Sequence, residues 1–92
     1  MRLKDTDQFV EARIREFVAR ELLYSPDGFP YADDASFLQE GIIDSLGVME
    51  LVAFVRRSFG VNVEQHEIKP DNFDSVTRLA AFIRHKQAGG AV

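Results

Sequence analysis

Several residue types and patterns are absent from this 92-residue chain, and each absence removes a class of function. There is no cysteine, which excludes a disulfide framework, a thiolate metal site and a cysteine nucleophile. The longest apolar runs, Leu51–Val55 and Leu79–Ile83, are five residues each and far too short to cross a bilayer. The first residues contain no apolar segment of the kind that a secretory signal needs. We therefore expect a cytoplasmic protein without membrane insertion.

Positive charge is also in short supply, since the formal net charge is −4. A nucleic-acid-binding surface needs a basic patch for the phosphates, so this balance argues against nucleic acid as a partner. The acids are unevenly placed: the stretch from Ser25 to Asp44 holds five of them and no lysine or arginine. This stretch is either an ordinary solvated loop or a surface that steers basic partners.

The spacing of apolar residues predicts an all-α bundle. From about Asp5 to Tyr24 apolar residues recur at steps of three and four, the period of an amphipathic helix, with Asp5 or Thr6 as N-cap. Two prolines and a glycine then end this helix and open a long loop that reaches Asp44. Four apolar residues should hold the loop against the core: Phe37, Leu38, Ile42 and Ile43.

Three further helical segments follow the loop. The second helix should run from Ser45 to Phe59, because Asp44 can cap its start and Gly60 can end it in the left-handed conformation. A single helical turn is expected at Pro70–Phe73, with proline at its first position. The last helix follows, capped by Asp74 or Ser75. We expect one domain over residues 1–92, with an ordered core at about 5–87 and a flexible tail at 88–92.

The second helix carries two apolar stripes. The first should face the core and comprises Val48, Leu51, Val52, Val55 and Phe59. Leu46, Met49 and Ala53 form a smaller stripe that begins beside Ser45, and it is either a docking surface for partners or additional core. Ile68 could extend this surface, and Glu50 lies next to it. An aromatic-rich core is expected from Phe9, Phe17, Phe37, Phe54, Phe59, Phe73 and Phe82.

The segment Gly-Ile-Ile-Asp-Ser-Leu-Gly-Val-Met-Glu-Leu at residues 41–51 resembles the prosthetic-group site of acyl and peptidyl carrier proteins. Phe59-Gly60 at the end of the helix and Asn-Phe-Asp-Ser-Val at residues 72–76 also match that family. The resemblance implies a four-helix carrier fold, with a long loop between helices one and two. It also implies that Ser45 anchors 4′-phosphopantetheine, whose thiol carries a thioester. Asp44 would then assist recognition by the transferase and its magnesium, and Leu46 completes the motif.

The same resemblance implies a role and a set of partners. The chain would be a non-catalytic, monomeric carrier of acyl or aminoacyl groups in fatty acid, polyketide or nonribosomal peptide biosynthesis. Its partners would be a phosphopantetheinyl transferase, an acyl- or aminoacyl-loading ligase, and a downstream transferase or synthase. The second helix has one acid, Glu50, against two arginines, and Gly47 stands where fatty-acid-synthase carriers often have an acid. A specialised, aminoacyl or peptidyl stand-alone carrier with a small cargo fits this pattern better.

Two other functions could use the same residues. A hydrolytic triad would combine Ser45 with His66 or His85, but no Gly-x-Ser-x-Gly elbow surrounds the serine. Both histidines lie in polar runs, where surface positions are expected, and they lack metal-ligand partners at a useful spacing. The remaining alternative is a helical interaction module that has no prosthetic group and docks through the stripe of Leu46, Met49 and Ala53.

Overall fold

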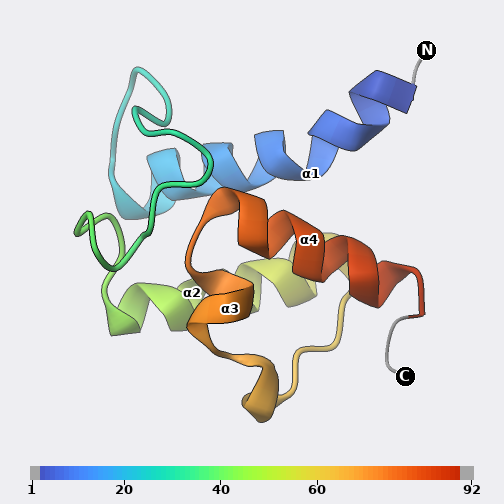
Figure 1. Ribbon diagram of the computed structural model, residues 1–92. Coiled ribbons are helices and arrows are strands. Elements are labelled where there is room, and N and C mark those ends of the chain that lie inside the picture. Colours follow the sequence, from blue (N-terminus) through green and yellow to red (C-terminus); the bar gives the residue numbers. More distant parts are fainter. Residues whose placement is uncertain (1–2, 90–92) are drawn as a thin grey trace.

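The computed structural model describes residues 3–89, with side chains from residue 9 onward, and contains helices but no strands within that range. Four α-helices and two short helical segments make up the order α1 (Leu3–Phe17), η1 (Val18–Leu22), α2 (Ser45–Phe59), η2 (Gln65–Glu67), α3 (Pro70–Phe73) and α4 (Val76–Gln87). Figure 1 shows α1 and α2 on opposite sides of α4, with α3 beside the start of α4. The prediction of three longer helices and one short one is confirmed.

The core lies where the inner faces of the longer helices meet. α1 contributes Val10 and Ile14, and η1 contributes Val18; the three are spaced four residues apart, and their side chains are buried. From α2 and α4 come Leu51, Val52, Val55, Val76, Leu79, Ala80 and Ile83, all at most 1% exposed. The radius of gyration is 12.6 Å, close to the value of about 12 Å expected for a compact chain of this length. The helical period read from the sequence therefore selected the correct inner faces.

The two ends of the first helix differ from the prediction. Asp5 and Thr6 lie inside α1, so neither of them is its N-cap. At the other end the helix widens into the π-helical segment η1, where Leu23 N–H donates to the Val18 carbonyl at 2.9 Å. Tyr24 then takes φ +53°, a left-handed conformation that closes the helix as a glycine usually would. The helix thus ends where expected, but through a wider turn.

The long loop between α1 and α2 is fixed by three of its four predicted anchors. Phe37, Ile42 and Ile43 are buried in the core, whereas Leu38 is 48% exposed, so the prediction for Leu38 is wrong. Residues 36–41 form turns in which Glu40 N–H donates to the Ser36 carbonyl and Gly41 N–H to the Leu38 carbonyl. The turn directs Phe37 inward and its neighbour Leu38 toward the surface, a difference that hydrophobicity by itself does not predict.

The aromatic core is smaller than the sequence suggested. Phe9 is 54% exposed, so its prediction as a core residue is wrong. Its ring instead contacts Arg13, whose guanidinium also lies over the Phe59 ring, at 5.4 Å and 4.9 Å from the two centroids. Phe17 and Phe59 are half-buried, and the Phe17 ring stacks on Phe54 at 4.3 Å between centroids. The aromatic side chains at this end of the bundle therefore cover the core from outside.

Ser75, one of the two predicted candidates, caps α4. Its side-chain oxygen accepts a hydrogen bond from Arg78 N–H at 3.0 Å. Asp74 is not the cap and binds the loop instead. α4 ends at Gln87 and is followed by a turn at residues 88–89. Residues 90–92 of the tail predicted to be flexible lie outside the described residues.

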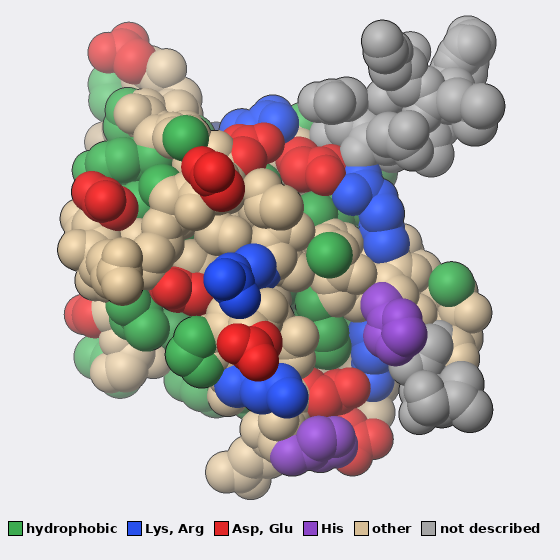
Figure 2. Space-filling model, in the orientation of Figure 1, with side chains coloured by type: hydrophobic (Ala, Val, Ile, Leu, Met, Phe, Trp, Pro, Cys, Tyr) green, Lys and Arg blue, Asp and Glu red, His purple; other side chains and the backbone are tan. Residues whose placement is uncertain are grey.

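Ion pairs connect the helices to one another and to the loops. Arg84 of α4 pairs with Glu11 of α1 at 2.6 Å, and Arg15 of α1 forms two hydrogen bonds with Asp33 of the long loop. On the face shown in Figure 2, acidic and basic side chains are interleaved over α3 and α4. Acidic side chains prevail over the long loop, at the upper left of the same view. No helix within residues 3–89 is long and apolar enough to span a membrane.

Candidate functional site at the start of helix α2

Ser45 is the first residue of α2, and its position depends on the residue before it. Asp44 has an extended backbone, and its side-chain Oδ1 accepts a hydrogen bond from Gly47 N–H at 2.9 Å. Val48 N–H donates to the Asp44 carbonyl at 3.1 Å. The predicted N-cap is confirmed, and so are the end of the helix at Phe59 and the left-handed Gly60 that follows it. Capping at Asp44 leaves the Ser45 side chain exposed at the helix start.

Gly47 allows the loop to pack tightly against the first turn of α2. A Cβ atom built on Gly47 would lie 2.5 Å from Ile43 Cγ2, closer than such contacts occur in proteins. The backbone of Gly47 is therefore the surface on which Ile43 packs, two residues before Ser45. A larger side chain at position 47, such as an acid, would have to displace Ile43. The glycine that distinguishes this position from the acid common in fatty-acid-synthase carriers thus has a steric basis in this chain.

The stripe of Leu46, Met49 and Ala53, here called the outer stripe, is exposed. Leu46 is 77% exposed and Met49 is 54% exposed, while Ala53 and Glu50 also face solvent. The stripe belongs to a shallow groove between α2 and the end of the first helix, where Phe17, Glu21 and Arg57 form the remaining wall. The possibility that the outer stripe is additional core is therefore wrong for Leu46 and Met49.

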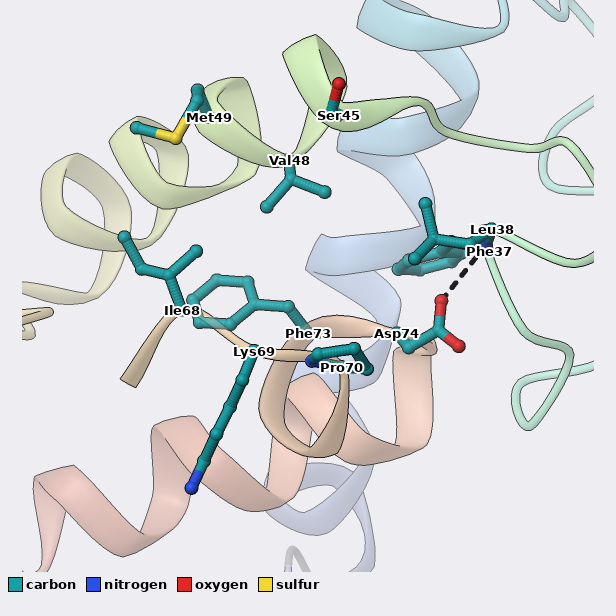
Figure 3. A pocket seen from close by; sticks show the side chains of 10 residues that line it. All are labelled: Phe37, Leu38, Ser45, Val48, Met49, Ile68, Lys69, Pro70, Phe73 and Asp74. Atoms are coloured by element: carbon teal, nitrogen blue, oxygen red, sulfur yellow. Dashed lines mark hydrogen bonds between the residues drawn. The ribbon is translucent and has the colours of Figure 1, made fainter. Parts of the chain in front are cut away.

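A second hollow, of about 270 Å³, lies between the start of α2 and helix α3. Figure 3 shows Val48 and Met49 of α2 on one side and Ile68 and Phe73 on the other, with the Ser45 oxygen pointing away from the hollow. Its lining is largely apolar. The full lining is Phe37, Leu38, Ser45, Val48, Met49, Ile68, Lys69, Pro70, Phe73 and Asp74. This hollow, the α2–α3 cavity, brings three of the predicted site residues together: Ser45, Met49 and Ile68.

Two charged residues hold the segment that carries Ile68. Glu67 accepts a hydrogen bond from Glu64 N–H at 2.9 Å, and the ammonium group of Lys86 lies 2.9 Å from its carboxylate. The Glu64 N–H, followed by Lys86, lowers the pKa of the Glu67 carboxyl below its ordinary value, because both contacts stabilise the charged form. Glu67 thus joins η2 to α4 and fixes the wall of the cavity opposite α2.

Sequence reasoning missed the polar side of this site. Asp74 lines the α2–α3 cavity and receives hydrogen bonds from the long loop, from Leu38 N–H at 3.0 Å and from the Ser36 hydroxyl at 2.5 Å. Phe37 and Leu38 line the same cavity, although the sequence placed both in the core. The available signal was the pair Asp74-Ser75, which offers two capping side chains where a helix needs one.

The histidines do not join this site. His66 lies on η2 and His85 on α4, both are exposed, and neither lines the α2–α3 cavity beside Ser45. Their predicted surface positions are confirmed. Among the side chains that the structure describes, residues 9–89, there is no group of three or more histidine, aspartate or glutamate side chains arranged to hold a metal ion. The described residues of the site are thus the Ser45 hydroxyl, the capping carboxylate of Asp44, the carboxylate of Asp74 and apolar surfaces.

Comparison with known proteins defines the class. The family model for the phosphopantetheine attachment site matches residues 12–83. The chain therefore belongs to the phosphopantetheine-binding carrier protein family, and 4′-phosphopantetheine is its covalent cofactor. The chain is also similar to the probable acyl carrier protein PigG of Serratia sp. (strain ATCC 39006), with 35% identity over 54 residues. That alignment covers 54% of this chain and 62% of PigG. It thus spans less than two thirds of the relative's length.

The residues at the start of α2 fit such a group. Ser45 offers an exposed primary hydroxyl, and the structure describes no hydrogen bond that occupies it. The first N–H groups of a helix have no acceptor within the helix, and the helix dipole favours negative charge there. Asp44 engages only Gly47 N–H among these groups, so others stay available near the hydroxyl. A phosphodiester on Ser45 would thus meet a favourable electrostatic environment.

Proposed function

We propose that Ser45 bears the 4′-phosphopantetheine group and that the chain is a non-catalytic carrier of acyl or aminoacyl thioesters. The observation that carries this proposal is the exposed Ser45 hydroxyl at the capped start of α2, inside the region that matches the family model. The bound group supplies a thiol to which an acyl group is attached as a thioester. Because the chain contains no cysteine, no thiol of the protein competes for the cargo.

The chain's own residues would present the hydroxyl and receive the enzymes that act on it. Asp44 holds the first turn of α2, so the hydroxyl is fixed outside the bundle, where a phosphopantetheinyl transferase can reach it. The exposed carboxylate of Asp44 lies beside the hydroxyl in sequence and is available to the transferase and its magnesium. The outer stripe, with Glu50 and Ile68, provides an adaptable apolar surface for the transferase, a loading ligase and a downstream transferase or synthase.

We further propose a small acyl or aminoacyl cargo. Leu51, Val52 and Val55 on the inner face of α2 are at most 1% exposed, and protein interiors are packed tightly enough to leave few voids for a long chain. The α2–α3 cavity, at about 270 Å³, lies below the range of about 300–1,000 Å³ typical of pockets that bury a drug-sized ligand. Loading the chain with a small aminoacyl group and with a medium-length fatty acyl group tests this. Large backbone NMR shifts at Val52, Val55 and Ile83 with the fatty chain would contradict it.

Intact mass spectrometry after incubation with coenzyme A and a broad-specificity phosphopantetheinyl transferase tests the attachment itself. The expected result is a mass gain of one phosphopantetheine group, lost in Ser45→Ala. Ser58→Ala is the matched control, since Ser58 lies on the same helix and is half-buried, and this variant should be modified as the parent chain is. Attachment at any other serine would contradict the proposal. No gain with several transferases would favour an interaction module without a prosthetic group.

A further inference from the structure

Asp74 lies at the junction of α3 and α4 and holds the long loop by three hydrogen bonds. Its carboxylate accepts from the Ser36 hydroxyl at 2.5 Å and from Leu38 N–H at 3.0 Å. Its backbone carbonyl accepts from Phe37 N–H at 2.9 Å. Figure 3 shows the bond to Leu38 across one end of the α2–α3 cavity. Three consecutive loop residues are therefore attached to one residue that lies 36 to 38 positions later in the chain.

The attached loop residues lead directly to the start of α2. The Phe37 carbonyl accepts hydrogen bonds from Ile42 N–H at 2.8 Å and from Ile43 N–H at 3.2 Å. Ile43 packs against the backbone of Gly47, and Asp44 then caps the helix through Gly47 N–H. Each step is a hydrogen bond or a close contact between described residues. A continuous set of interactions thus connects Asp74 with the turn of α2 that begins at Ser45.

The hydrogen bonds between Asp74 and the loop also shape the cavity beside Ser45. Phe37 and Leu38 form one of its walls together with Asp74, while Val48 and Met49 form the wall contributed by α2. Leu38 is 48% exposed, so its burial is incomplete, and the hydrogen bond from its N–H to Asp74 also holds it in place. Asp74 is half-buried and its bond to Ser36 is partly buried, while helix α4 is capped by Ser75 instead. Its carboxylate is therefore available to accept hydrogen bonds from the loop.

We propose that Asp74 is a positioning residue for the modification of Ser45: it keeps the loop, and through it the first turn of α2, in the conformation that a phosphopantetheinyl transferase binds. This inference rests on the proposed attachment of the group to Ser45. Without Asp74 the loop populates other conformations, and only a fraction of the molecules presents the serine correctly. The apparent affinity for the transferase falls by that fraction, whereas turnover of the bound complex is unchanged.

The experiment compares Asp74→Ala with two variants in the same region. Asp71→Ala is the matched control for charge, because Asp71 is exposed on α3 and makes only a 3.8 Å contact with Arg78. Asp74→Asn should restore the attachment, because its amide oxygen can accept from Leu38 N–H and its NH₂ can donate to the Ser36 hydroxyl oxygen. Ile83→Val on the buried face of α4 is a control for stability, since it weakens the core at a residue that does not line the α2–α3 cavity.

The first readout is the steady-state kinetics of the transferase with each variant as substrate. For Asp74→Ala we expect KM to rise about fivefold with kcat unchanged. The substitution removes the two side-chain hydrogen bonds to the loop, and their net contribution favours the native loop conformation by a factor of about this size. Asp74→Asn should return KM to near the parent value, while Asp71→Ala and Ile83→Val should leave it there. A parent-like KM in Asp74→Ala, or an equal rise in Ile83→Val, would overturn the inference.

The second readout, amide hydrogen exchange, does not depend on the prosthetic group. Asp74→Ala should speed exchange at Ile42, Ile43 and Gly47, whose hydrogen bonds go to residues other than Asp74, and leave Leu79 in α4 protected. Faster exchange at Phe37 and Leu38 only would mean that Asp74 does not act on α2, and the inference would fail. If Asp74→Ala does not fold, Ser36→Ala removes one of the three bonds and should give a smaller effect of the same pattern. If the parent chain is never modified, the proposed function fails, and exchange still decides whether Asp74 positions α2.

Discussion

Two faces of helix α2 both carry apolar side chains, but those on one face are buried and those on the other are exposed. On the inner face Leu51, Val52 and Val55 are at most 1% exposed and join side chains from α1 and α4. On the outer face Leu46 and Met49 are more than half exposed, beside Ser45 and two surface hollows. Water therefore surrounds apolar groups on one side of the helix and is excluded from them on the other.

The difference separates stability from recognition. Burial of an apolar side chain contributes roughly 1.5–3 kcal/mol, so the inner face stabilises the bundle. An exposed leucine contributes little to folding, and its apolar surface is available to a partner. A leucine occurs on each face, one exposed and one buried, so the comparison can be tested with identical substitutions.

The largest effect is expected from Leu51→Ala. Leu51 is fully buried, and truncating such a side chain removes its burial energy and leaves a cavity, at a cost of about 2–5 kcal/mol. Denaturant unfolding measures the loss as a lower midpoint with an unchanged slope. A decrease in the free energy of unfolding of less than about 1 kcal/mol would show that the inner face of α2 does not stabilise the bundle as we infer.

Gly47→Ala should have the next largest effect. Alanine favours a helix over glycine by about 1 kcal/mol, yet its Cβ would lie 2.5 Å from Ile43 Cγ2. Overpacking of this kind costs about 1–3 kcal/mol, so we expect net destabilisation and a displaced loop. Ile43→Leu removes the Cγ2 methyl group, and the double variant should recover part of the loss. A more stable Gly47→Ala chain would mean that Ile43 moves aside freely.

A smaller, pH-dependent effect on stability is expected from Glu67→Gln, because Glu67 holds the wall of the α2–α3 cavity that lies opposite α2. The pKa of Glu67 is lowered in the folded state, so its contribution is complete above the ordinary pKa near 4.5 and is lost as the pH falls through the lower folded value. Thermal unfolding from pH 7 to pH 3 should show a shallower acid loss in Glu67→Gln than in the parent chain. Glu40→Gln, on the exposed loop, is the control. Parallel curves for Glu67→Gln and the parent would contradict this prediction.

Leu46→Ala should change stability least. Its side chain is 77% exposed, so the free energy of unfolding should stay within about 0.5 kcal/mol of the parent value. The rate of modification by the transferase or of loading by a ligase should fall, because the apolar contact beside Ser45 is lost. Stopped-flow or mass-based kinetics measure the rate, and thermal unfolding measures stability. If Leu46→Ala destabilises the chain as much as Leu51→Ala, the division between the faces is wrong.

Local signals in the sequence predicted much of this architecture. The bounds of α2 follow from Asp44 and Gly60, because capping bonds act within three or four residues of the position that makes them. The short turn at Pro70–Phe73 and the inner faces of the helices also follow from local spacing. The motif around Ser45 indicated the family, to which the chain belongs. These features require no knowledge of which elements meet in space.

The errors occur where distant elements decide the outcome. Phe9 and Leu38 are apolar and stand at plausible core positions, but no neighbouring element covers them fully. The hydrogen bonds of Asp74 to the loop were not predicted either, because the local sequence indicated only that Asp74 or Ser75 caps the last helix. Its actual partners, Ser36 and Leu38, reach it only after the chain has folded back.

The sequence by itself determined the helices, the caps and the serine at the start of α2, because the hydrogen bonds and periodicity that encode them are local. Only the tertiary structure decided which apolar residues stay in water, how the long loop reaches α2, and which walls enclose the cavity beside Ser45. Those features depend on contacts between residues far apart in the chain, such as Phe37 with Asp74 and Glu67 with Lys86. The exposure of Phe9 and Leu38 depends on which elements pack over them, and the local pattern of residues does not specify that.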